Sequence, residues 1–285
     1  MRKIKPLNDF IFKKLFGEKG NEDILEAFIN AVLSRTNKGP ITGVEIIENK
    51  ELTKELIGDK TGIIDVRART FNGEHIDIEV QLTNQGNMDK RTLFYWGKLY
   101  LENIKKGEDY KELEKVITIN ILDFEFLDTT GYQSSFHLWE DIDKDYMLTD
   151  LIEIHFLELP KFIKKESKNF KDNPIERWLA FLEEDTSETM LKELMSMEPA
   201  IKKAEDKLEY LSSDEETMNI YWERERSLHE RANMLSSAEE RGFDKAMNEV
   251  AKSLLDILEN ETIASKTGLF LEDIIELRNK ALSKK

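Results

Sequence analysis

Hydrophobic and polar positions repeat with two different periods along the chain, and the period separates helices from strands. A spacing of three to four residues predicts three helices in the first part of the chain: 7–16, 22–33 (after an Asn21 cap) and 89–105. Alternation or short apolar runs predict four strands besides a central hairpin: 43–48, 116–122, 132–140 and 151–159, the last stopped by Pro160. The helix 89–105 and the strand 116–122 would form a crossover from the hairpin, which indicates an α/β fold.

The hairpin is predicted around residues 71–74, Phe-Asn-Gly-Glu, because an Asn-Gly pair lies between two β-rich runs. A two-residue turn on Asn72 and Gly73 would mix polar and apolar residues on both faces, which a half-buried sheet disfavours. A three-residue loop over 71–73, with Gly73 left-handed at a bulge, sorts the two faces instead. We therefore predict the register that follows from the longer loop.

In this register one face of the hairpin is apolar and the other carries acids. The apolar face holds six residues: Ile64, Val66, Ala68, Ile76, Ile78 and Val80. The opposite face consists of three cross-strand pairs: Asp65 with Glu79, Arg67 with Asp77, and Ile63 with Gln81.

The pair Asp65 and Glu79 makes this face a candidate cation-binding site. Cross-strand partners have Cβ atoms about 5 Å apart, and two ionised carboxylates there repel by roughly 3 kcal/mol at an effective dielectric near 20. A bound divalent cation converts that repulsion into ligation. The alternative is a solvated polar face on which Arg67 screens the acids, and the pattern leaves both interpretations open.

Composition and missing motifs limit the classes of function. The 285 residues include 42 basic and 58 acidic ones, a net charge of −16, which argues against strong nonspecific nucleic-acid binding through bulk electrostatics. The lack of cysteine excludes disulfides, thiol catalysis and Cys-ligated metals. The sequence has no P-loop, GxGxxG, GxSxG or HExxH motif, and its four histidines are scattered. With no signal-like or membrane-spanning stretch, we expect a cytoplasmic protein that does not contact membranes.

Three further features are candidates for function, each with a structural alternative. Arg91 on the helix 89–105 could point toward the acidic face or lie on the surface. Asp9 could reach the site, but a surface or capping role is favoured. The only sustained basic run is a candidate phosphate-backbone contact or a solvated loop, and its members are Lys161, Lys164, Lys165, Lys168 and Lys171.

Composition changes at Asn173, which divides the chain into a predicted core domain, 1–172, and a helical region, 173–285. Asn173-Pro174-Ile175-Glu176 is typical of a helix start. A charge-rich stretch over 214–241 predicts a long exposed helix, through which the protein could form a homodimer. After an amphipathic stretch over 246–258, residues 261–281 predict a helix-turn-helix-like hairpin, either a packing unit or a DNA reader.

The motif Asp65…Glu79-x-Gln81, on a hairpin followed by a helix, resembles the PD-(D/E)XK nuclease motif in the branch where glutamine replaces lysine. Six segments also resemble, in order and over nearly the whole chain, the Rpn family of recombination-promoting nucleases and transposases: 7–17, 76–81, 91–100, 107–122, 154–162 and 264–274. One departure is Phe270, which stands where the family often has a serine or similar cap before the last helix.

This resemblance implies a restriction-endonuclease-like core (helix, three-strand meander, helix, strand) with an all-helical C-terminal extension, and Mg²⁺-dependent hydrolysis of DNA phosphodiester bonds. Carried over by position, Asp65 and Glu79 would hold Mg²⁺ or another divalent cation, with the carbonyl of Val80 as a further ligand. Gln81 would orient the attacking water, and Arg91 would contact a phosphate. Because Gln81 is neutral, we expect slower chemistry than with lysine, or a greater dependence on a second cation.

A non-enzymatic function is the alternative. The fold could serve as a nucleic-acid or protein interaction module whose acid pair binds a cation for structure only. The net negative charge and Gln81 favour this alternative, whereas the like-charge pair and the intact motif spacing favour the enzyme.

Overall fold

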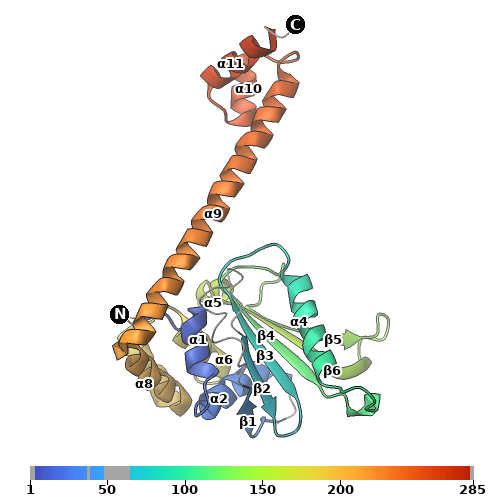
Figure 1. Cartoon of the computed structure of the whole chain (residues 1–285), viewed down its shortest axis with the longest axis vertical. Coiled ribbons are helices and arrows are strands. Elements are labelled where there is room, and N and C mark those ends of the chain that lie inside the picture. The colour runs from blue at the N-terminus through green and yellow to red at the C-terminus, as the bar shows by residue number, and fades with distance from the viewer. Residues whose placement is uncertain (1–3, 37–38, 48–64, 283–285) are drawn as a thin grey trace. The chain divides into compact units, whose positions relative to one another are not determined.

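The computed structural model describes residues 4–36, 39–47 and 65–282 (Figure 1). Contacts divide the chain into two compact units, Met1–Arg224 and Glu225–Lys285. The first unit is an α/β structure built on a six-stranded sheet with the order β1-β2-β3-β4-β6-β5. The predicted fold class is therefore confirmed.

The strands are β1 (Val44–Ile46), β2 (Asp65–Thr70), β3 (His75–Gln81), β4 (Val116–Leu122), β5 (Gln133–Trp139) and β6 (Met147–Glu158). Strands β1, β2 and β3 form an antiparallel meander, β4 runs parallel to both β3 and β6, and β5 pairs antiparallel with β6 at the edge. Helix α4 (Met88–Glu102) joins β3 to β4, because parallel neighbours require a crossover. This is the crossover that the sequence predicts.

The β2–β3 hairpin has the predicted three-residue loop. Gly73 adopts a φ of +100°, and its N–H donates to the carbonyl of Thr70 at 3.0 Å. This loop sets Asp65 directly across from Glu79, and Arg67 across from Asp77. Two residues in the predicted pairing, Ile63 and Ile64, lie outside the described residues.

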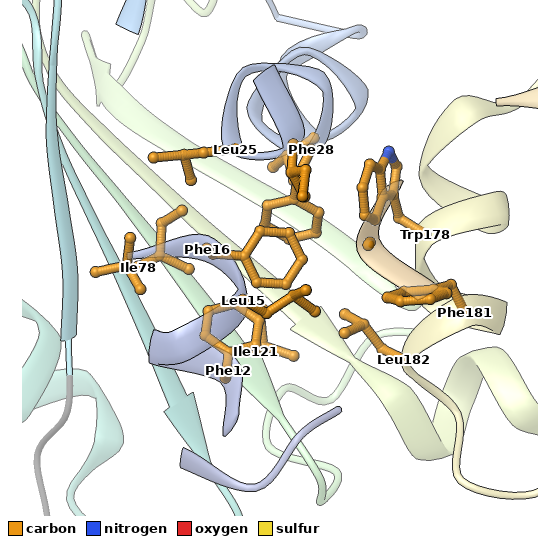
Figure 2. Close-up of a cluster of buried hydrophobic side chains, with 14 of the residues drawn as sticks. Phe12, Leu15, Phe16, Leu25, Phe28, Ile78, Ile121, Trp178, Phe181 and Leu182 are labelled. Atoms are coloured by element: carbon orange, nitrogen blue, oxygen red, sulfur yellow. The ribbon is translucent and has the colours of Figure 1, made fainter. Parts of the chain in front are cut away.

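The main hydrophobic core lies between one face of the sheet and a layer of helices. Its helices include α1 (Asp9–Phe16), α2 (Glu22–Leu33), α6 (Pro174–Leu182) and α8 (Pro199–Ser213). Trp178 packs its ring 5.7 Å from that of Phe16 and 5.6 Å from that of Phe28, measured between centroids (Figure 2). Burial of such large aromatic side chains contributes strongly to stability.

Helices α6 and α8, which follow residue 172, therefore share the core of the sheet. The first unit also contains the 3-10 turn η1 (Tyr110–Glu112) and the helices α5 (Leu159–Ile163) and α7 (Glu188–Met197). The compact unit continues to Arg224, whereas the predicted boundary between 172 and 173 follows composition. As a division into functional parts, that boundary stays a prediction.

Several helix and strand ends differ from the prediction. Asn21 precedes α2, but its side-chain amide donates to the carbonyls of Lys14 at 3.1 Å and Leu15 at 3.0 Å. Asn21 therefore occupies the predicted N-cap position of α2, but its side chain binds carbonyls at the end of α1 and makes no capping hydrogen bond to α2. Strand β6 begins at Met147, earlier than predicted, and helix α9 (Glu215–Leu254) continues without a break into the stretch predicted as a separate amphipathic segment.

The second unit contains the later part of α9, then α10 (Asn260–Thr267) and α11 (Leu271–Leu282). Four fully or nearly buried residues form its small core: Ala251, Leu255, Ile263 and Ile274. Gly268 turns the chain between α10 and α11 at a φ of +74°, as the predicted helical hairpin requires. No helix in the described ranges combines the length and apolar character needed to span a bilayer.

Candidate active site

The sheet face opposite the main core carries buried polar side chains on its two central strands. They are Asp77 and Glu79 on β3 and Thr118 and Asn120 on β4, which alternate with residues of the core. Helix α4 packs against β4 on this face, and Trp96 donates its indole N–H to the carbonyl of Val116 at 3.2 Å. These polar groups are therefore buried between the sheet and α4. The burial of each one destabilises the fold unless a hydrogen bond or an opposite charge compensates it.

Glu79 is the acid at the centre of this face and is only 3% exposed. The guanidinium Nε of Arg91 lies 3.3 Å from its Oε2 oxygen, and the same guanidinium lies 5.2 Å from the ring of Tyr95. The alternative of a surface arginine is therefore wrong, because Arg91 points at the acidic face. Its positive charge compensates the buried carboxylate.

Gln81 lies two residues after Glu79 on β3 and shares its face, as strand alternation predicts. Its side-chain amide donates to the Oε2 oxygen of Glu79 at 3.5 Å. Glu79, Gln81 and Arg91 thus come together in the fold.

The remaining predicted site residues are placed by β2 and β3. Asp65 is described by its backbone pairing alone, which sets it across from Glu79. Asp77 lies 3.6 Å from the Nε of Arg67, the partner that the sequence favours. The side chain of Val80 packs in the main core, and its carbonyl as a metal ligand stays a prediction.

Sequence reasoning missed two polar residues of β4 that lie beside the site, Thr118 and Asn120. Asn120 pairs with Glu79 across the sheet, and it accepts a hydrogen bond at 3.1 Å from the hydroxyl of Thr92, the residue after Arg91. The Asn120 amide also donates to the carbonyl of His155 at 3.0 Å. The signal was present, because Thr118 and Asn120 are polar at alternate positions of an otherwise apolar strand.

Asp9 and the basic run are engaged within the first unit. An Asp9 oxygen lies 2.7 Å from a guanidinium nitrogen of Arg224, so Asp9 is a buried acid held in an ion pair, and its participation in the site stays a prediction. Four of the five lysines of the run pair with carboxylates: Lys161 with Glu158, Lys164 with Glu125, Lys165 with Glu176, and Lys168 with Glu183. Their charge is largely balanced inside the protein, which weakens their case as phosphate contacts.

A divalent cation fits the donor types on this face. Among the side chains that the structure describes, no group of three or more His, Asp or Glu residues is arranged to hold a metal, and the Asp65 side chain is not among them. The predicted ligands are two carboxylates and one carbonyl. Mg²⁺ prefers such oxygen ligands and retains several waters when few protein ligands bind it.

Comparison with known proteins gives one finding. The sequence matches a family model described as PD-(D/E)XK nuclease family transposase over residues 6–238. The search of curated proteins gave no match, and the search of solved structures gave none either. The matched range includes the β2–β3 hairpin, α4 and β4, which together form the candidate site.

Proposed function

The chain belongs to the PD-(D/E)XK nuclease family transposases, and from this premise we propose that it is a metal-dependent DNA endonuclease that hydrolyses phosphodiester bonds. The observation that carries the proposal is the hairpin register, in which Asp65 stands directly across from the buried Glu79. A buried acid opposite a second acid is unfavourable in a sheet stabilised by packing alone. Ligation of a cation gives this arrangement a function.

The proposed role of each site residue follows from the chemistry of its polar groups. Asp65, Glu79 and the Val80 carbonyl hold a divalent cation, with Mg²⁺ as the expected ion, which supplies Lewis-acid chemistry and lowers the pKa of a bound water. Gln81, next to Glu79, orients the attacking water through its amide. A guanidinium has five N–H donors, so Arg91 can contact Glu79 and a phosphate oxygen together.

The proposal is tested by incubating supercoiled plasmid with the full chain, with Mg²⁺ or with a chelator. We expect wild type to nick the plasmid only with Mg²⁺, and Asp65→Ala and Glu79→Gln to lose nicking. Asp141→Ala is the matched control, because Asp141 is an exposed acid outside the site and its loss should leave nicking unchanged. If wild type and Asp65→Ala nick equally, or neither nicks with any divalent cation, the enzyme proposal is lost.

A second candidate function is a catalytically weak or inactive module that binds nucleic acid or protein. The neutral Gln81 favours it, because an amide cannot stabilise the negative charge that develops during hydrolysis. In that case Mg²⁺ would stabilise the protein without plasmid nicking. DNA is the proposed partner of the endonuclease, and nucleic acid or a protein is the partner of the alternative module. A cytoplasmic location and a homodimer through the C-terminal helical region remain proposals, and sedimentation tests the homodimer.

A further inference from the structure

An apolar cavity of about 320 Å³ opens on the same sheet face as the candidate site. Its lining includes three phenylalanines, Phe126, Phe136 and Phe156, together with Leu93 and Thr92 of α4. The ring of Phe156 lies 5.3 Å from that of Phe126 and 5.9 Å from that of Phe136, measured between centroids. Phe156 is buried at the base of this cluster, whereas Phe136 is 44% exposed.

The cavity and the candidate site share one row of the sheet, in which the buried Asn120 lies between them. Glu79 pairs with Asn120, and Asn120 pairs with Phe156 on the next strand. Two strand spacings place Phe156 about 10 Å from Glu79 on the same face. The cavity wall also meets the site on α4, because Thr92 bonds Asn120 and follows Arg91.

The lining selects an uncharged ring over a phosphate. The described residues that line the cavity include no lysine or arginine, and an exposed carboxylate, Asp89, stands among them. A phosphate would be repelled there, whereas a nucleobase is planar and uncharged, can stack on phenylalanine and can donate an N–H to a carboxylate. The volume lies at the lower end of the range for small-ligand pockets.

We propose that this cavity receives an unpaired nucleobase of the DNA whose phosphate lies at Glu79. The substrate class is then DNA with an unstacked nucleotide beside the cleaved bond, as at a mismatch or in a single strand. This inference rests on the proposed function for the position of the phosphate. A base that remains paired stays inside its duplex and cannot enter, so the cavity favours extruded bases.

The test is a binding measurement that requires no cleavage. Fluorescence anisotropy of the full chain in Ca²⁺, an oxygen-ligated cation that can take the place of Mg²⁺ at the acid pair, compares two labelled duplexes of equal length and charge, one fully paired and one with a central mismatch. We expect wild type to bind the mismatched duplex about fivefold or more tightly than the paired one, the effect of stacking one base on aromatic side chains. Phe136→Ala should remove this preference.

Two leucines of α4 provide a matched pair of further variants. Leu93 lines the cavity and is 53% exposed, whereas Leu101 is 72% exposed and is not part of the lining. We expect Leu93→Ala to reduce the preference and Leu101→Ala to retain it. Because both side chains are largely exposed, this pair keeps the test informative even if Phe136→Ala fails to fold.

Each outcome bears on the inference separately from the proposed function. Equal binding of the two duplexes by wild type, or a preference that survives both Phe136→Ala and Leu93→Ala, overturns the base site and leaves the plasmid result untouched. If Phe136→Ala instead lowers the mass measured by sedimentation, a second copy of the chain covers the cavity and the base site is also lost. A mismatch preference in a protein that never nicks plasmid would keep the base site and remove the endonuclease.

Discussion

Replacing Asp65 by asparagine removes one of the two carboxylates that the β2–β3 register sets opposite each other. With cross-strand Cβ atoms about 5 Å apart, two ionised carboxylates repel by roughly 3 kcal/mol at an effective dielectric near 20. The guanidinium of Arg91, 3.3 Å from Glu79, offsets part of that repulsion. We therefore expect Asp65→Asn to raise the free energy of unfolding by about 1–2 kcal/mol in a solution without divalent cations.

Mg²⁺ should reverse this order of stabilities. A cation that binds only the folded protein stabilises it by about 2.7 kcal/mol at a free concentration 100 times its Kd. Wild type should gain this stabilisation, whereas Asp65→Asn has lost one charged ligand and should gain little. The variant is then the more stable protein in chelator and the less stable one in Mg²⁺.

Urea unfolding followed by circular dichroism measures both effects, with chelator in one series and Mg²⁺ in the other. Asp141→Asn is the control for general charge screening, because Asp141 is exposed and distant in sequence from the hairpin. If Mg²⁺ shifts the urea midpoints of wild type and Asp65→Asn equally, the cation does not bind at the acid pair. If the variant is less stable than wild type in chelator, the repulsion argument itself is refuted.

Three further predictions concern neighbouring groups. Gln81→Lys should raise the rate of Mg²⁺-dependent plasmid nicking about tenfold or more, because an ammonium stabilises developing negative charge and a neutral amide does not. An unchanged or lower rate would count against the proposed role of Gln81 at the attacking water. Arg91→Met should lower the free energy of unfolding by about 1–3 kcal/mol in chelator, because Glu79 loses the guanidinium beside it. The loss should be smaller in Mg²⁺. Equal losses in chelator and in Mg²⁺ would argue against a cation at Glu79. Burial alone would raise the pKa of Glu153, but hydrogen bonds from His155, Lys115 and Thr36 outweigh it and hold that pKa below its ordinary value of 4.5. Because the folded-state pKa is depressed, this stability is present above about pH 4.5 and is lost as the pH falls further, so urea midpoints from about pH 7 to pH 3 should fall less steeply in Glu153→Gln than in wild type.

The parts of the fold that sequence reasoning reached are those fixed by local rules. The register of the β2–β3 hairpin follows from Gly73, which alone in its loop has a positive φ, and from side-chain alternation. The strand over 116–122 was recognised from its apolar run and has the predicted bounds. Association of the later helices with the sheet was not foreseen, because the contacts of Trp178 with Phe16 and Phe28 join segments far apart in the chain.

The candidate site could be predicted from the sequence to the same extent as the fold. The cross-strand pairs are local, so the sequence sufficed for them, whereas the direction of Arg91 depends on how α4 packs on the sheet. The basic run could not be resolved in this way. Lys164 pairs with Glu125, 39 residues earlier, and no local pattern reports such a partner. The sequence therefore left a phosphate contact and a solvated loop as open alternatives.

The proposed metal site and the proposed base site lie at opposite ends of one row of residues across the sheet. From β2 to β6 the row passes from Asp65 and Glu79 through Asn120 to Phe156, so the chemistry changes from anionic to amide to aromatic over three strand spacings. A nucleotide changes in the same order, from a phosphate that needs a cation beside acids to an uncharged ring that needs a surface without charge. An acid pair that served packing alone would not require an open aromatic cavity two strands away from Glu79. The order of the row, more than any single residue, favours a nucleic-acid substrate over a protein partner at this face.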